Sequence, residues 1–182
     1  MDLQAYKDAI ERLAATKSDL EFPNSSVEHA SIVVEALIKY ADSEVRIYDD
    51  SISGDLDINS AISNQFKTIV NAGKQLKVVV RHHVKNDSNI YKTLKDLSVS
   101  HPKQVEVRIA SSKFTTSVKN ELGNDLNFAT GDKSAYRLEN LEKKADGKII
   151  RTAQGSFNRP EKTKKLVQIF DENFASCNAY QF

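Results

Sequence analysis

Three short apolar segments, separated by helical patterns, constrain the fold more than any other feature of this sequence. The segments lie at residues 45–48, 76–80 and 105–109. The middle segment is apolar at nearly every position, which is typical of a central strand buried on both faces. Apolar residues at helical spacing cover residues 58–72 and 90–97, between these segments. This β-α-β-α-β order with short connections predicts parallel strands with helices packed against the sheet.

Two further helices are predicted before this alternation. Apolar residues at helical spacing over residues 3–15 indicate an amphipathic first helix, and Pro23 then interrupts the pattern. Ser25, followed three residues later by Glu28, matches the capping box that opens a helix, which would run to about Ala41.

The C-terminal third has a different pattern. Three strand-like segments follow Gly123, at residues 126–130, 135–139 and 148–152. A long helix is predicted from about residue 160 to about residue 176. The sequence therefore predicts an α/β fold in which a mixed sheet carries helices on both faces.

The chain length and composition suit one cytoplasmic domain. We expect 182 residues to form a single domain, with residues 1–22 as a helical N-terminal appendage and residues 27–176 as the core. Cys177 is the only cysteine, so an internal disulfide is excluded and a reducing compartment fits best. The first residues lack the apolar region of a signal peptide, and no apolar run is long enough to cross a bilayer, so we expect no membrane association.

Polar residues in the C-terminal third carry the strongest functional signal. Asp125, Asn127 and Asp132 are followed by Gly-Ser-Phe-Asn at residues 155–158 and then by a helical pattern. This order resembles the end of a phospholipase D superfamily half-domain, in which His-x-Lys, four residues and Asp are followed by Gly-Ser-x-Asn and a helix. The resemblance covers residues 27–176 and implies the fold of such a half-domain, with an additional N-terminal helix.

The resemblance also implies that the catalytic groups are missing. With Asp132 as the family's aspartate, Asn127 takes the lysine position and Asp125 takes the histidine position. In the family, one histidine attacks the phosphorus, another protonates the leaving oxygen, and the lysines neutralise the phosphoryl oxygens. Asp125 is anionic and would repel a phosphodiester, and Asn127 brings no charge. The expected site is therefore vestigial, with no catalytic residue, and consists of Asp125, Asn127, Asp132, Ser156 and Asn158.

Ordinary structural roles are the competing interpretation for these residues. Asn158 is suited to cap the last helix, with Pro160 in its first turn. Asp132 follows Gly131 in a possible tight turn, where aspartate commonly bonds its own backbone.

Two histidines follow the central strand. His82 and His83 stand where parallel-sheet proteins place their sites, so either could act as the base if the protein is active. Adjacent residues on an extended segment point to opposite sides, and no cysteine or acid at ligand spacing accompanies them. We therefore predict no metal site and no cofactor.

Arginines recur on the predicted strands. Arg81, Arg137 and Arg151 could form an anion-binding floor in a vestigial site. The alternative is that the strand arginines pair with glutamates on exposed or edge faces of the sheet. The pairs available are drawn from Arg46, Arg81, Arg108, Arg137 and Arg151 on one side and Glu44, Glu106 and Glu139 on the other.

Three functions remain compatible with these residues. The first is a non-catalytic binding or regulatory module that recognises a protein or nucleic acid. A lone half-domain of this family needs two copies to build one site, so we expect a homodimer, and a bacterial or phage defence system is a setting by analogy. The second is a phosphodiesterase or nuclease with a rearranged site that uses His82 or His83. The third is nucleic-acid binding in a basic groove across a dimer, although the net charge of +1 supplies no overall attraction.

Overall fold

A mixed β-sheet forms the centre of the molecule. The computed structural model describes residues 2–51, 56–83, 88–143 and 147–182. Within these residues the sheet has eight strands in the order β1-β7-β6-β5-β2-β3-β4-β8. β2, β3 and β4 are parallel to one another, and every other neighbouring pair is antiparallel. The strands are β1 (Phe22–Asn24), β2 (Glu44–Asp49), β3 (Gln75–Val80), β4 (Val105–Ile109), β5 (Phe128–Gly131), β6 (Ala135–Lys143), β7 (Ile149–Ser156) and β8 (Asn178–Ala179).

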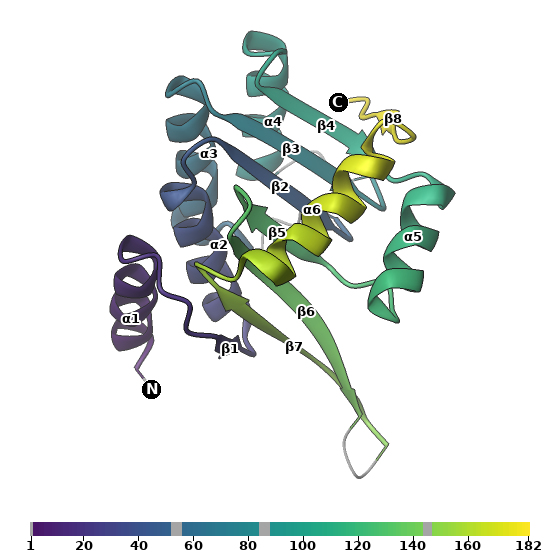
Figure 1. The fold of residues 1–182 in the computed structure, drawn as a ribbon. Coiled ribbons are helices and arrows are strands. Elements are labelled where there is room, and N and C mark those ends of the chain that lie inside the picture. The colour runs from purple at the N-terminus through teal and green to yellow at the C-terminus, as the bar shows by residue number, and fades with distance from the viewer. Residues whose placement is uncertain (1, 52–55, 84–87, 144–146) are drawn as a thin grey trace.

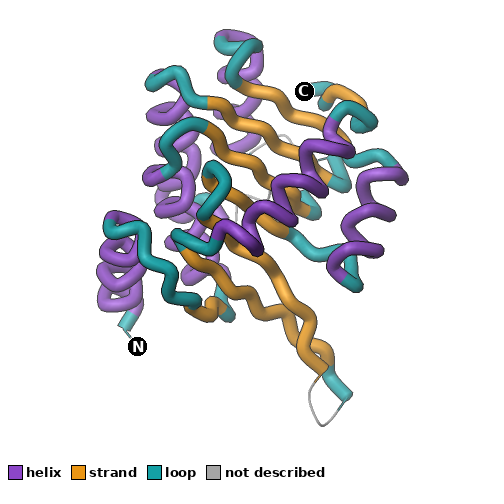
Figure 2. Tube along the Cα trace, viewed as in Figure 1, coloured by secondary structure: helices purple, strands orange, loops and turns teal. Residues whose placement is uncertain are grey.

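Helices cover both faces of this sheet, as Figures 1 and 2 show. On one face α2 (Val27–Tyr40), α3 (Ala61–Asn71) and α4 (Asn89–Ser100) lie side by side, and α1 (Leu3–Ala15) packs against α2. A short 3₁₀ helix, η2 (Ile58–Ser60), leads into α3. The other face carries α5 (Ser112–Leu122) and α6 (Pro160–Phe174). The prediction of an α/β fold with a mixed sheet between two helical layers is confirmed.

The central strand β3 is buried on both faces and divides the core in two, as its nearly continuous apolar pattern predicted. Leu76, Val78 and Val80 pack with the α1–α4 layer, whereas Val79 packs with the α5–α6 layer. Alternate residues of a strand point to opposite faces, so a segment that is apolar at nearly every position buries side chains on both. The four side chains are at most 1% exposed.

Several strands have their ends at the same end of the sheet. The parallel strands β2 and β3 end together, with Asp49 opposite Val80. β5 runs antiparallel to β2 and pairs Phe128 with Tyr48, so the segment that precedes β5 begins at this same edge. Polar residues that follow β2 and β3, and polar residues that precede β5, are thereby brought together.

Two helix starts differ from the sequence prediction. The capping box at Ser25 was wrong, because the cap of α2 is Ser26, whose hydroxyl accepts a hydrogen bond from the His29 amide. Asn158 is not the cap of α6 either. That position is held by Arg159, which makes no side-chain cap bond, and Pro160 occupies the first turn.

The helix α5 was missed. Its hydroxyl cap is Ser111, which accepts a hydrogen bond from the Phe114 amide, and Gly123 ends it with a left-handed φ of 79°. Only Phe114 and Val118 of this helix are buried, so its apolar pattern is short. Across the residues described, the structure contains no helix that is long and apolar enough to span a membrane.

Candidate functional site

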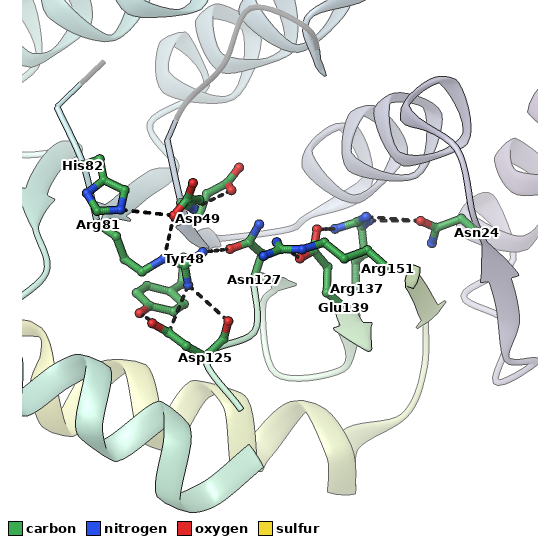
Figure 3. Close-up of polar contacts among 11 residues, drawn as sticks. Asn24, Tyr48, Asp49, Arg81, His82, Asp125, Asn127, Arg137, Glu139 and Arg151 are labelled. Carbon is green, nitrogen blue, oxygen red and sulfur yellow. Dashed lines mark hydrogen bonds and ion pairs between the residues drawn. The ribbon is translucent and has the colours of Figure 1, made fainter. Parts of the chain in front are cut away.

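Arg81 is the centre of a polar network at the carboxyl ends of β2 and β3. Its guanidinium Nη1 donates to Asp125 Oδ1 at 3.0 Å, and its Nε donates to Asp50 Oδ1 at 3.1 Å. Its Nη2 also donates to Asn127 Oδ1. The guanidinium lies over the Tyr48 ring, with its central carbon 5.0 Å from the ring centroid. Figure 3 shows these contacts converging from the ends of β2 and β3 and from the segment before β5.

The surroundings of Arg81 keep this network charged. The Arg81 side chain is only 8% exposed, and burial alone would lower its pKa. Its contacts with Tyr48, Asp125 and Asp50 outweigh burial and raise the pKa above the ordinary arginine value. Burial also raises the pKa of Tyr48, so its hydroxyl stays protonated and donates to Asp125 Oδ1 at 2.7 Å. Asp125 and Asn127 align with the histidine and lysine positions of the family's motif, and here they bind the Arg81 guanidinium group.

Asp132 lies at the opposite end of β5 from Asp125 and Asn127. Its φ of 53° is left-handed, and its carboxylate accepts hydrogen bonds from the start of β2. Oδ2 accepts from the Asp42 amide at 2.7 Å, while Oδ1 accepts from the Ser43 and Glu44 amides at 2.8 and 3.1 Å. Burial raises the Asp132 pKa, but these bonds outweigh it and hold the pKa below its ordinary value. Asp132 thus fixes the entry into β2.

Ser156 and Asn158 are near the Asp132 end of the sheet. Ser156 pairs with Tyr136 at the start of β6, and its hydroxyl accepts the Asn158 amide at 3.3 Å. Ser156 is fully buried, so both residues serve the turn into α6. The five residues expected to form the vestigial site are therefore not brought together: Asp125 and Asn127 are at one end of the sheet, and the others are at the other end.

The glycine of the Gly-Ser-x-Asn segment has a packing reason. A β-carbon at Gly155 would lie 3.0 Å from ring atoms of Phe22 and from the Tyr136 carbonyl oxygen. Gly155 pairs with Phe22 of β1, and that ring lies over it. This glycine lets the first strand of the chain close against the end of β7.

Neither histidine after β3 joins the Arg81 network closely. His82 is 71% exposed in its side chain, and its Nε2 lies 3.5 Å from Asp50 Oδ1. The His83 ring packs against Tyr180, with ring centroids 5.1 Å apart. The two rings therefore have different surroundings, as expected of adjacent residues. In the described ranges, no three histidine, cysteine or acidic residues are grouped closely enough to hold a metal ion.

Arg137 and Arg151 belong to a second row of polar groups, next to the first. Arg137 donates to Asn24 Oδ1 through Nε at 3.3 Å and through Nη2 at 3.2 Å. Glu139 lies between the two arginines, 3.7 Å from Arg137 Nη1 and 3.1 Å from Arg151 Nη1. Figure 3 shows this row beside Asn127. Arg81, Arg137 and Arg151 thus do not form one common anion-binding floor.

The competing prediction, that strand arginines pair with nearby glutamates, agrees with four of the contacts. These are Arg46 with Glu44 at 2.6 Å, Arg108 with Glu106 at 2.8 Å, and Arg137 and Arg151 with Glu139.

A cleft of about 340 Å³ opens along this second row. Asp49 and Asp50 line it from the end of β2, Asn127 lines it beside β5, and Arg137 and Glu139 line it from β6. Burial raises the pKa of Asp49 to about 7, and the negative charge of Glu139 adds to this. The amide of Asp50 and the charges of Arg137 and Arg81 act in the opposite direction.

Several residues of this edge were not singled out as site residues from the sequence. They are Asn24, Tyr48, Asp49, Asp50 and Glu139. For three of them a signal existed, since Tyr48, Asp49 and Asp50 end a predicted parallel strand, where α/β proteins place ligands. Asn24 and Glu139 had none, because their position depends on the pairing of β1 and β6 with β7.

Comparison with solved structures shows the same fold in distant proteins. TrmBL2, an archaeal chromatin protein described as having a novel mode of DNA binding, matches with a TM-score of 0.60 and 14% identity over 97% of this chain. This chain spans 62% of the length of that protein. Nuc from Salmonella typhimurium, a phospholipase D family member, matches with a TM-score of 0.59 and 13% identity, covering 90% of this chain and 99% of Nuc.

NucT from Helicobacter pylori gives a similar result. Its TM-score is 0.57 at 14% identity, and the match covers 88% of this chain and 99% of NucT. No protein-family model matches the sequence, and no curated protein matches it. At these identities the likeness concerns the fold.

Proposed function

We propose that this chain, which has a phospholipase D-like fold, is a binding or regulatory module that does not hydrolyse phosphodiesters. The observation that carries the proposal is the Arg81 network. The Arg81 guanidinium is bonded to Asp125, Asn127 and Asp50, so the position expected for the catalytic histidine and lysine is filled by an internal ion pair. A phosphodiester would have to displace two carboxylates from Arg81 to reach it.

The available nucleophiles support the same proposal. Asp125 is committed to Arg81 and to the Tyr48 hydroxyl, and its charge repels an anionic substrate. His82 is exposed next to another carboxylate, that of Asp50, and His83 packs on Tyr180. Catalysis of phosphoryl transfer needs positive charge close to the phosphoryl oxygens. Here Arg81, Arg137 and Arg151 are each paired with an acidic side chain.

The proposed partner is a nucleic acid or a protein, recognised by a homodimer. The similarity of fold to an archaeal chromatin protein described as binding DNA favours testing DNA first. Size-exclusion chromatography with light scattering tests the dimer, since a strict monomer at high concentration would contradict it. DNA binding followed by fluorescence anisotropy at 50 and 200 mM salt tests the nucleic-acid arm, because phosphate contacts make affinity fall steeply with salt. Absence of DNA binding would point to a protein partner, as would be natural in a bacterial or phage defence system.

Catalysis is tested directly with a generic phosphodiester. We expect the protein to hydrolyse bis(p-nitrophenyl) phosphate no faster than buffer. The contrary result is turnover without added metal that is abolished in His82→Ala or His83→Ala but retained in the control His101→Ala. That result would establish a phosphodiesterase with a rearranged site and would overturn the proposal.

A further inference from the structure

The cleft beside the Arg81 network has a charge pattern that fits a zwitterion better than a phosphate. Arg137 and Arg151 bring two positive charges to its wall, and Glu139 and Asp50 bring two negative ones. Asp49 adds a carboxyl group that can carry a third negative charge. A phosphate dianion in this cleft would face at least as many carboxylates as guanidinium groups. A ligand with one anionic and one cationic group can satisfy both kinds of side chain.

Two features of the cleft favour an anionic group on one side of it. Asn24 is 3% exposed, its Oδ1 accepts two hydrogen bonds from Arg137, and its Nδ2 has no hydrogen-bond partner. Buried donors in folded proteins are nearly always paired, and this amide, on a residue that lines the cleft, lacks an acceptor among the described residues. The N-terminus of α2, at Ser26 and Val27, also lines the cleft, and the dipole of this 14-residue helix favours negative charge there.

Asp49 lines the cleft as a carboxyl group without a close cation. Its Oδ1 accepts the Asp50 amide at 2.6 Å, and neither arginine of the cleft makes an ion pair with it among the contacts described. Burial raises its pKa to about 7, as expected of a carboxyl that lacks a close cation. A ligand ammonium group would supply that cation.

An apolar cavity lies next to the cleft. This second cavity has a volume of about 40 Å³ and shares Leu56, Asp49, Asn127 and Arg137 with the cleft. Its remaining lining is mainly aliphatic and aromatic and includes Val34, Phe66, Val78 and Leu94. Room for a water needs roughly 10–15 Å³ on this measure, so the cavity accommodates about three heavy atoms, the size of a short branched side chain.

We propose that this cleft binds a free α-amino acid with a short aliphatic side chain, such as leucine or valine. The α-carboxylate lies against Arg137, Asn24 and the α2 N-terminus, the ammonium group lies against Asp49, and the side chain enters the apolar cavity. This goes beyond the binding-module proposal, because it gives the chain a small-molecule ligand whether or not it also binds a macromolecule.

Isothermal titration calorimetry of the full chain tests the proposal with three probes. L-Leucine is expected to bind at one site, roughly tenfold to a hundredfold more tightly than glycine, because only leucine fills the apolar cavity. Inorganic phosphate is expected not to compete with leucine. Absence of leucine and valine binding at millimolar concentration, binding of glycine as tight as that of leucine, or competition by phosphate would each overturn the proposal.

Two variants test the two halves of the site separately. Asp49→Asn keeps the shape of the side chain but removes its charge, and leucine affinity is expected to fall at least tenfold. Val78→Leu fills the apolar cavity from β3, and it is expected to remove the preference for leucine over glycine while glycine binding persists. Val107→Leu, a buried valine of β4 outside both cavities, is the matched control and is expected to keep the preference.

Thermal melts establish that each variant is folded before titration. Leucine binding by folded Asp49→Asn that equals wild type would contradict the assigned ammonium contact. An unchanged leucine-to-glycine ratio in folded Val78→Leu would contradict the assigned side-chain cavity. The ligand series with the wild-type chain decides the proposal even if a variant fails to fold.

Discussion

Individual carboxyl groups of this protein are held in opposite ways. Asp49 is buried without a close cation, and its pKa rises to about 7. Hydrogen bonds from backbone amides and from Ser43 instead hold the pKa of Asp132 below its ordinary value. The two therefore have opposite effects on stability as pH changes. Asp132 fixes the entry into β2 at one end of the sheet, whereas Asp49 lines the cleft at the other end.

Asp49 is expected to make the protein less stable as pH rises from about 4 to about 7. Its pKa is higher in the folded chain than the roughly 3.9 of an unfolded one, so the folded state binds more protons in this window. Asp49→Asn should remove this penalty and stabilise the protein by roughly 2 to 4 kcal/mol at pH 8, with little effect near pH 4. Thermal or urea unfolding at both pH values measures this. Asp96→Asn, an exposed position on α4, is the control, and an equal effect of both changes at pH 8 would contradict the expectation.

Loss of Arg81 is expected to cost far more than loss of an exposed arginine. Arg81→Gln leaves Asp125, which is 22% exposed, and Asp50 without their common cation. Removing one partner of such a buried group should destabilise the protein by roughly 2 to 4 kcal/mol. Arg151→Gln, at a side chain that is 57% exposed, should cost less than about 1 kcal/mol. Urea unfolding midpoints compare the two, and similar costs would show that the network adds no stability.

At the scale of single elements, the sequence predicted the parallel strands and the helices between them well. The apolar run at Leu76–Val80 and the helical spacing around it are local signals, and local signals suffice for such elements. Helix α5 escaped because only Phe114 and Val118 mark its buried face, although Ser111 and Gly123 at its ends are readable start and stop signals. Strands β1 and β8 are too short to have a period of their own.

The site was less predictable than the fold because it is assembled by pairing between distant segments. The Arg81 and Asp125 side chains meet although they are 44 residues apart, and this follows from β5 lying antiparallel beside β2. No local pattern states which strands become neighbours. Asp125 and Asn127 precede β5 and Asp132 follows it. The strand therefore separates residues that the sequence analysis had assigned to one site.

Asp132 is expected to stabilise the entry into β2. Asp132→Ala removes the acceptor for the amides of Asp42, Ser43 and Glu44, and should cost roughly 1 to 3 kcal/mol. Hydrogen exchange of these amides should become faster. Asp132→Asn keeps one acceptor oxygen and tolerates the left-handed φ, so it should have a smaller effect. Equal protection in Asp132→Ala and wild type would contradict the assigned contacts.

Gly155→Ala is expected to loosen the contact between β1 and β7. The added methyl group would meet the Phe22 ring and the Tyr136 carbonyl at 3.0 Å, which should cost roughly 1 to 3 kcal/mol. The double variant Gly155→Ala with Phe22→Leu should recover part of the loss relative to the sum of the single changes, as a double-mutant cycle by urea unfolding would show. Strict additivity would exclude the ring as the source of the clash.

At the scale of the whole molecule, a phospholipase D-like fold does not by itself make an enzyme. Restoring the family's residues with Asp125→His and Asn127→Lys is expected to give no phosphodiester turnover. The change removes both partners of Arg81 on that side and places a lysine ammonium group next to its guanidinium group. Measured turnover above buffer would show that the scaffold retains more of a catalytic arrangement than its contacts indicate.

The pairing of β1 with β7 sets an order in which this chain can fold. Residues 22–24 hydrogen-bond to residues 153–155, so a strand near the N-terminus has no sheet partner until most of the chain has been synthesised. The opposite edge is similar, since β8 at residues 178–179 covers β4. Contacts between such distant segments form late, because the intervening loop must be closed first. During synthesis, the parallel core can assemble first, while one edge of the sheet stays open until residues 153–155 have emerged and the other until residues 178–179 have emerged.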